Sequence, residues 1–397
     1  MSGRRLGTAV LLYLATAVAV ITLAPFEFET RPVHGLTARW GVYDLVMNVV
    51  MFVPVGFVYA LSRARARATT WATWLGAVAL GALLSGAVEL AQVFAPSRFP
   101  SLFDLAANTA GAGLGAWLAA AALAKAEAGT TVRALAVDLP LMGLVYLMAP
   151  LLWLVALGAD DPERAWAMAP LAVGAAWAIA SAFTSFEEAT RSRVLFVTGA
   201  WTAVALLPGA VQRPALAAAV AAVALAVAWA RTVAPAHITH ETGDSGAPSR
   251  RFEAATLRVV LPLFAVYLVL ACLLPWSAPT QGWSATLGLP VRGDLRDPDI
   301  YRVLEQIAAF TLLGYAVAEH RGRVRHGAVE LLASILAWTI PAATLFQAIQ
   351  GWHPAYRASG LLLALTIAAA VGGGRIYVLQ LEHVRALAAR PRPPRIA

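Results

Sequence analysis

Long apolar stretches recur along this chain, and they limit its fold more than any other feature. Each is about 20 residues long, the length at which a helix crosses the hydrocarbon core of a bilayer. A helix pairs its own backbone N–H and C=O groups, which lipid cannot do, and the stretches lack the polar alternation of barrel strands. Of the 397 residues, 60% are hydrophobic and only 13% are charged. We therefore predict an all-α fold, a polytopic membrane helix bundle.

The apolar stretches predict about twelve transmembrane helices. The first is expected to remain in the protein, because Leu23-Ala24-Pro25-Phe26 at its end is a poor signal-peptidase site. The spans are expected near residues 6–24, 42–61, 71–94, 102–124, 134–157, 165–183, 194–210, 214–233, 257–276, 301–318, 327–350 and 358–380.

The basic residues indicate how these spans are oriented. If the N-terminus is cytoplasmic, most of the 30 Lys and Arg residues fall in cytoplasmic loops and tails, as expected of residues that resist translocation. Both termini are then cytoplasmic, and the turn between residues 95 and 101 faces outward. The net charge of +8 thus reflects membrane topology, and we expect no nucleic-acid partner. The single cysteine, Cys272, lies in an apolar stretch, and we expect no metal site and no cofactor.

The C-terminal part of the sequence repeats the N-terminal part at a constant offset of 258 residues. Matching pairs are Asn48 and Gln306, Phe52 and Phe310, Gly56 and Gly314, Glu89 and Gln347, Gln92 and Gln350, and Pro96 and Pro354. A fixed register across three spans predicts two pseudo-repeated four-helix units around a four-helix middle, similar to the parallel repeats of some transporters. The expected divisions are a membrane domain at 1–127, a middle segment at 128–236, a cytoplasmic linker at 237–256 and a second repeat with a basic tail at 257–397.

Polar residues interrupt three neighbouring spans of the first repeat. At helical spacing Asp44 and Asn48 share one face, as do Ser85, Glu89 and Gln92 on the next span and Asp104 and Asn108 on the third. Arg98 lies in the turn between the last two spans. Charged groups in hydrocarbon are costly and generally turn toward partners or a cavity. The candidate ligand-binding residues are therefore Asp44, Asn48, Ser85, Glu89, Gln92, Arg98, Asp104 and Asn108.

Structural interpretations of these residues stay open beside the functional one. The set is also compatible with a buried hydrogen-bond network that fixes the register of the helices. Asp104, close to the start of a span, is equally compatible with a helix N-cap.

Two stretches carry a resemblance to a known family. DLVMNVVMFVPVGF from Asp44 and SGAVELAQVFAPSRFPSLFDLAANTAGAGLG from Ser85 resemble the VanZ-like family, named after an integral membrane protein associated with teicoplanin resistance. The matching residues are Asp44, Asn48, Phe52-Val53-Pro54, Gly56, Ser85, Glu89, Gln92, Arg98, Asp104, Asn108, Gly111 and Gly115. The resemblance is clear in residues 40–120, and it implies a protein of the bacterial cytoplasmic (inner) membrane and of the cell envelope.

The second copy, in residues 257–375, departs from this pattern. Leu362 and Thr366 stand at the places of Asp104 and Asn108, and Arg302 stands at the place of Asp44. This degenerate repeat has lost its acidic groups. Its candidates for a shared site are Gln347, Gln350 and Arg357.

Three functions remain open on the sequence. The first is an accessory protein that contacts membrane lipids and binds a lipid-linked glycan or a lipophilic glycopeptide at the outer leaflet, in antibiotic resistance or in envelope or exopolysaccharide metabolism. The second is an enzyme acting on a lipid-linked substrate, with Glu89 and Asp104 as catalytic candidates. We favour binding, because the sequence shows no nucleophile elbow and no metal motif. The third is a transporter or flippase, which the repeats suggest.

Overall fold

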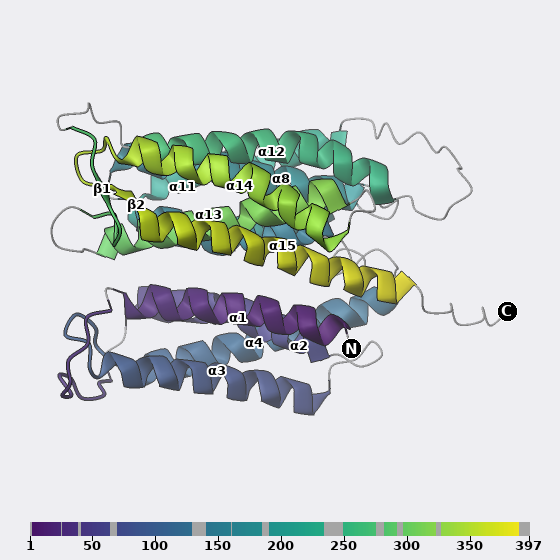
Figure 1. The fold of residues 1–397 in the computed structure, drawn as a ribbon. Helices are drawn as coiled ribbons and strands as arrows, with labels where there is room; N and C mark the ends of the chain where they lie inside the picture. The colour runs from purple at the N-terminus through teal and green to yellow at the C-terminus, as the bar shows by residue number, and fades with distance from the viewer. Residues whose placement is uncertain are drawn as a thin grey trace.

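The protein is a bundle of long, roughly parallel and antiparallel α-helices (Figure 1). In the computed structural model, the residues described are 2–24, 26–38, 41–63, 70–128, 140–159, 161–184, 190–233, 249–274, 282–291, 297–322 and 327–388. The helices are α1 (Ser2–Leu23), α2 (Val42–Arg63), α3 (Trp71–Gln92), α4 (Leu102–Ala128), α6 (Pro140–Leu157), α7 (Pro162–Ala165), α8 (Met168–Thr184), α9 (Arg191–Ala205), α10 (Leu207–Gln212), α11 (Pro214–Val233), α12 (Ser249–Leu273), α13 (Asp297–Gly322), α14 (Ala328–Gln350) and α15 (Gly360–Ala388).

The predicted membrane helix bundle is confirmed as a fold class. Within the described ranges, nine helical segments are long and apolar enough to cross a membrane. The other three expected spans fall on α4, on α6 and on α9 with α10. Residues 134–139 of the fifth expected span lie outside the described residues. Large apolar side chains such as Leu83, Phe196 and Trp338 are exposed on the surface of the bundle, where lipid would cover them.

The span expected at 194–210 is not one continuous helix. Helix α9 ends at Ala205, and the separate α10 begins at Leu207 with Pro208 in its first turn. Proline has no N–H to donate to the carbonyl four residues earlier. The indole N–H of Trp153 bonds that carbonyl, of Val204, at 2.9 Å instead. The break between the two helices therefore leaves no unpaired carbonyl at Val204.

The structure describes only the last part of the linker expected at 237–256. Helix α12 already begins at Ser249, so residues 249–256 belong to a helix, while 237–248 lie outside the described residues.

Two short parallel pairings mark one end of the bundle. Strand β1 (Ala285–Thr286) pairs with β2 (Ala358–Ser359), with Ala285 opposite Ala358 and Thr286 opposite Ser359. In the first unit a single parallel bridge joins Thr37 to Ser101. Figure 1 places β1 and β2 at the end opposite both termini, and we call this the strand end. The sequence did not predict these pairings.

Glycines bring two pairs of helices into backbone contact. A Cβ on Gly56 of α2 would overlap the carbonyl oxygen of Ala112 on α4, and one on Gly314 of α13 would overlap that of Ala370 on α15. Both members of the second pair lie 258 residues after those of the first. The α2–α4 and α13–α15 contacts thus have the same geometry at the predicted offset. Small residues allow this close approach, which supplies packing energy between helices in lipid.

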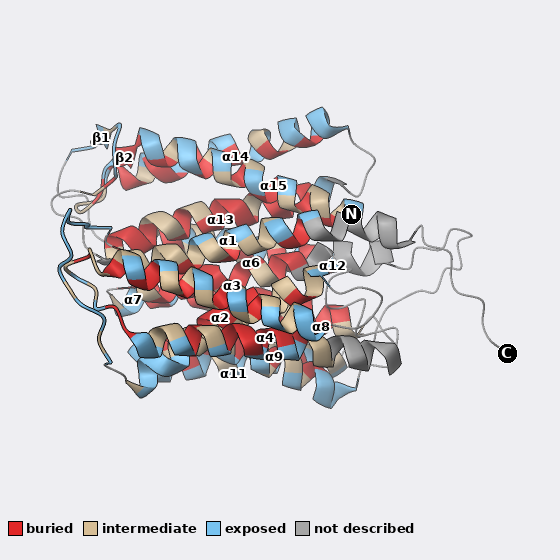
Figure 2. Cartoon of the chain, turned by 90° about the horizontal axis from the view of Figure 1, so that it is seen from below, coloured by how far each residue is buried: buried red, intermediate tan, exposed pale blue. Residues whose placement is uncertain are grey.

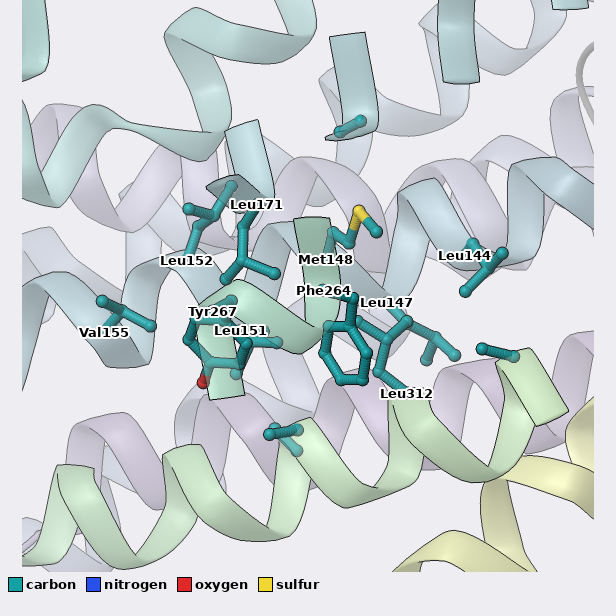
Figure 3. Packing of buried hydrophobic residues seen from close by; sticks show 14 of the residues in the cluster. Leu144, Leu147, Met148, Leu151, Leu152, Val155, Leu171, Phe264, Tyr267 and Leu312 are labelled. Carbon is teal, nitrogen blue, oxygen red and sulfur yellow. The ribbon is translucent and has the colours of Figure 1, made fainter. Parts of the chain in front are cut away.

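The largest apolar core lies among α6, α8, α12 and α13. Figure 3 shows side chains from these helices meeting, including Met148, Leu171, Phe264 and Leu312. In the apolar windows of the α7–α8 and α13 segments, 78% and 72% of the residues are buried, against 22% in that of α14. Figure 2 shows the same contrast between central and peripheral helices. The α7–α8 segment and α13 are therefore the centre of the bundle, and the N-terminal helices α1 to α4 pack at its side (Figure 1).

Candidate functional site

The predicted site residues of the first unit meet at the strand end. Asp44 is in the first turn of α2, Glu89 is near the end of α3, and Asp104 is in the first turn of α4. Because α3 runs toward this end and α4 starts from it, residues on both sides of the turn come together.

Glu89 supports the start of α4. Its carboxylate oxygen Oε2 accepts the backbone N–H of Ser101 at 2.7 Å, and both side chains are buried. The Ser101 hydroxyl in turn accepts the N–H of Phe103 at 3.2 Å, the contact that an N-cap residue makes. Ser101, and not Asp104, therefore caps α4, which excludes the N-cap interpretation of Asp104.

Asp104 lies between two polar side chains of α2. The Asn48 side chain hydrogen-bonds the Asp104 carboxylate, and the Asp44 carboxylate is close enough to repel it. Glu89 also interacts electrostatically with Asp104. Asp44 is exposed, whereas Asn48 and Asp104 are half-buried. We call Asp44, Asn48, Glu89 and Asp104 the acidic cluster, which extends from the bundle interior to its surface.

Ser85 and Asn108 form a second contact deeper in the unit. The Asn108 amide Nδ2 donates to the Ser85 hydroxyl at 2.9 Å, and both residues are buried. The amide oxygen Oδ1 of Asn108 has no hydrogen-bond partner in the described part of the chain. A buried acceptor without a partner costs about 1–3 kcal/mol.

Gln92 and Arg98 hold the end of α1. The Gln92 amide donates to the carbonyl of Thr22 at 3.0 Å, and Nε of Arg98 donates to that of Ala24 at 2.6 Å. Tyr301, at the start of α13, donates its hydroxyl to the carbonyl of Ile21 at 3.4 Å. The last carbonyls of a helix have no partner within the helix. Here three side chains from other elements each donate a hydrogen bond to one of these carbonyls.

The same arrangement recurs in the second unit around Gln347. Its amide oxygen accepts the N–H of Ser359 at 2.8 Å, and the Ser359 hydroxyl accepts the N–H of Leu362 at 3.0 Å. Ser359 and Gln347 lie 258 residues after Ser101 and Glu89. Gln347 also donates to Gln306 at 3.3 Å. A neutral amide therefore makes the contact that Glu89 makes in the first unit.

Sequence reasoning missed the residue that holds the end of α12. Arg164 donates to the carbonyls of Ala271 and Leu274 at 3.1 and 2.9 Å and to the Glu305 carboxylate at 2.5 Å. The other oxygen of Glu305 accepts the Tyr267 hydroxyl at 3.0 Å. An acidic residue at position 305, inside an expected span, was the signal that a buried partner must exist.

Two of the second-copy candidates separate in the structure. Gln350 is buried, whereas Arg357 is exposed and its backbone N–H donates to the carbonyl of Pro290 at 2.6 Å. The hydroxyl of the buried Tyr356 donates a hydrogen bond to Asp299 at 2.8 Å and accepts one from Arg302. Burial raises the pKa of Tyr356 to about 12, so its hydroxyl remains a donor at neutral pH.

The described ranges contain no group of three or more His, Cys, Asp or Glu side chains arranged to hold a metal ion. The three carboxylates of the acidic cluster can each accept hydrogen bonds. Ionised carboxylates accept short, strong bonds from hydroxyl and ammonium groups.

Comparison with known proteins identifies the N-terminal part of the chain. Residues 8–124 match the family model described as VanZ/LLP1, so this segment is VanZ-like and the chain is a multi-pass membrane protein. The match covers most of α1, all of α2 and α3, and most of α4, and therefore the whole acidic cluster. No curated protein and no solved structure matches the chain.

Proposed function

We propose that the VanZ-like unit is a binding module of the bacterial cell envelope. It holds the polar head of a lipid-linked glycan or of a lipophilic glycopeptide at the outer leaflet of the cytoplasmic membrane. The acidic cluster contacts hydroxyl or amino groups of this head, and neighbouring lipid accommodates the apolar tail.

The observation that carries this proposal is the convergence of Asp44, Asn48 and Asp104 at the strand end. Like charges repel, so bringing carboxylates together costs electrostatic energy. A hydrogen-bond donor or a cation that binds between them lowers this cost. Asp44 is exposed and Asp104 half-buried, so a ligand arriving from the strand end reaches both. Hydroxyl-rich and amine-bearing heads carry the donors that such a cluster accepts.

The distribution of basic residues supports an outward-facing strand end. Arg5, Arg63, Arg193 and Arg321 lie in the first or last turns of their helices, at the end that carries the termini. Basic residues gather on the cytoplasmic side of membrane proteins.

The position of Glu89 favours binding over general acid–base catalysis by this residue. Its carboxylate is buried and already bonds the backbone of Ser101, and it supports the cap of α4. We therefore assign contact with ligand to Asp44 and Asp104 and a supporting role to Glu89.

Binding by the full-length protein in nanodiscs tests this function. A polyprenyl-diphosphate-linked disaccharide and teicoplanin serve as probes, with affinity measured by microscale thermophoresis. We expect the wild type to bind at least one probe. Replacing both acids, Asp44→Asn with Asp104→Asn, should weaken binding by at least about tenfold, because one charge-assisted hydrogen bond is worth about 1.5–3 kcal/mol.

Asp161→Asn is the matched control, because Asp161 is an acid at the strand end that precedes α7, away from the cluster. It should bind like the wild type. Equal affinities of the wild type and the double variant, or no binding of either probe to the wild type, would contradict the proposal.

A further inference from the structure

A small polar cavity lies at the strand end of the second unit. Its volume is about 20 Å³, room for a single oxygen-sized group. Residues of α7, α12, α13, α14 and the turn after α14 line it. The polar ones are Arg164, Arg302, Gln306, Gln350, His353 and Tyr356. We call it the basic pocket.

The basic pocket occupies the register of the acidic cluster. Arg302 and Gln306 stand 258 residues after Asp44 and Asn48, and Gln350 stands 258 residues after Gln92. The change from Asp44 to Arg302 reverses the charge at this position. The second unit thus carries polar side chains at the positions equivalent to those of the first unit. Its arginine favours an anionic group where the aspartate of the first unit favours a cationic one.

The lining of the pocket is rich in hydrogen-bond donors. Among the residues that the structure describes, Nε of Arg164 is buried without a hydrogen-bond partner. Nδ1 of His353 accepts the N–H of Ala355 at 3.1 Å, which leaves Nε2 as the protonated nitrogen of the neutral ring. Gln306 uses its amide oxygen to accept from Gln347, so its NH2 group remains a donor.

The acidic residues nearest to the pocket do not line it. Glu305 is bonded by Arg164 and Tyr267, and Asp299 accepts from Tyr356. The amide oxygen of Gln350, a residue that is 8% exposed, also has no hydrogen-bond partner within the described ranges. An amide rotated by 180° presents its NH2 group at the same place, because oxygen and nitrogen positions of an amide are interchangeable assignments.

We propose that the basic pocket binds a phosphate group through one of its oxygens. Guanidinium groups are the preferred partners of phosphate oxygens in proteins, and an incoming acceptor gives Arg164 Nε the bond it lacks. The cavity admits one oxygen, and the rest of the phosphate remains beside the half-buried His353. The group belongs either to a lipid head at the outer leaflet or to free phosphate. This site is independent of the function proposed for the acidic cluster.

Binding of two probes to the purified full-length protein tests the proposal. Native mass spectrometry counts retained phosphatidic acid, whose phosphate is terminal, and isothermal titration calorimetry measures inorganic phosphate. We expect Gln350→Glu, nearly isosteric but negatively charged in the pocket, to weaken binding at least about tenfold. His353→Gln should weaken it less. His34→Gln, at a strand-end histidine of the first unit, should leave it unchanged.

The two probes distinguish the sources of the phosphate. Retention of phosphatidic acid that is lost in Gln350→Glu supports a lipid head group, and calorimetric binding of inorganic phosphate alone with the same loss supports the free ion. Should the wild type bind neither probe, or should Gln350→Glu and His353→Gln bind both as well as the wild type, the proposal is overturned. Thermal unfolding of each variant, compared with the wild type, shows that it is folded.

Discussion

Glu89 and Gln347 make the same contact with different charge. Each accepts the backbone N–H of a serine that caps the next helix, at 2.7 and 2.8 Å. The contact needs an acceptor and not a negative charge, since Gln347 makes it as a neutral amide. The structural and electrostatic contributions of Glu89 can therefore be separated by a single pair of variants.

We predict that Glu89→Gln leaves thermal stability close to that of the wild type, whereas Glu89→Leu lowers it. The leucine variant leaves the buried N–H of Ser101 without this acceptor, which costs about 1–3 kcal/mol. Thermal unfolding in detergent, followed by circular dichroism, measures both. Gln347→Leu is the matched variant of the second unit and should lower stability similarly. A glutamine variant as unstable as the leucine variant would show that the charge itself holds the fold.

At the scale of helices, the close contact of α2 with α4 depends on Gly56. We predict that Gly56→Ala destabilises the protein by about 1–3 kcal/mol, because its Cβ would overlap the backbone of Ala112, which cannot move without separating the helices. Gly86→Ala is the control: a Cβ there has nothing within 4 Å, and alanine is the better helix former. Its melting temperature should equal or exceed that of the wild type. If both substitutions were tolerated alike, Gly56 would not be the contact that sets the α2–α4 distance.

The helices were largely predictable, because their signals are local. Apolar length defines a span, and the spacing of Asp44 and Asn48, or of Asp104 and Asn108, defines a helix face. The break after α9 was not predicted, because Pro208 near the end of an apolar stretch is compatible with a tolerated kink. Only the Trp153 indole, from a distant helix, shows how the freed carbonyl of Val204 is paired.

The whole-molecule arrangement explains why the candidate site was predicted only in part. The acidic cluster depends on neighbouring helices of one unit, which the sequence pairs through a short turn. Tyr301 of α13 bonds the end of α1, and Arg164 of α7 bonds the end of α12. These contacts join different units, and no spacing within one segment indicates them. Helix α13 thus contacts the first unit through Tyr301 and lines the basic pocket through Arg302 and Gln306.

Orientation in the membrane is the property on which both proposed sites depend, since each opens at the strand end. We predict that the strand end faces outward, because the basic residues at the helix ends gather on the opposite side. A background with the single cysteine replaced, Cys272→Ser, allows new cysteines to report their side. Ser97→Cys, exposed in the α3–α4 turn, should react in intact cells with a membrane-impermeant maleimide.

Ser192→Cys, exposed at the start of α9 near the opposite end, should react only after the membrane is permeabilised. Both variants should react fully in detergent, which shows that both thiols are accessible. The reverse pattern, with labelling at 192 and protection at 97, would place the acidic cluster and the basic pocket on the cytoplasmic side. A ligand of the outer leaflet would then be excluded for both, while the contacts within each site would stand.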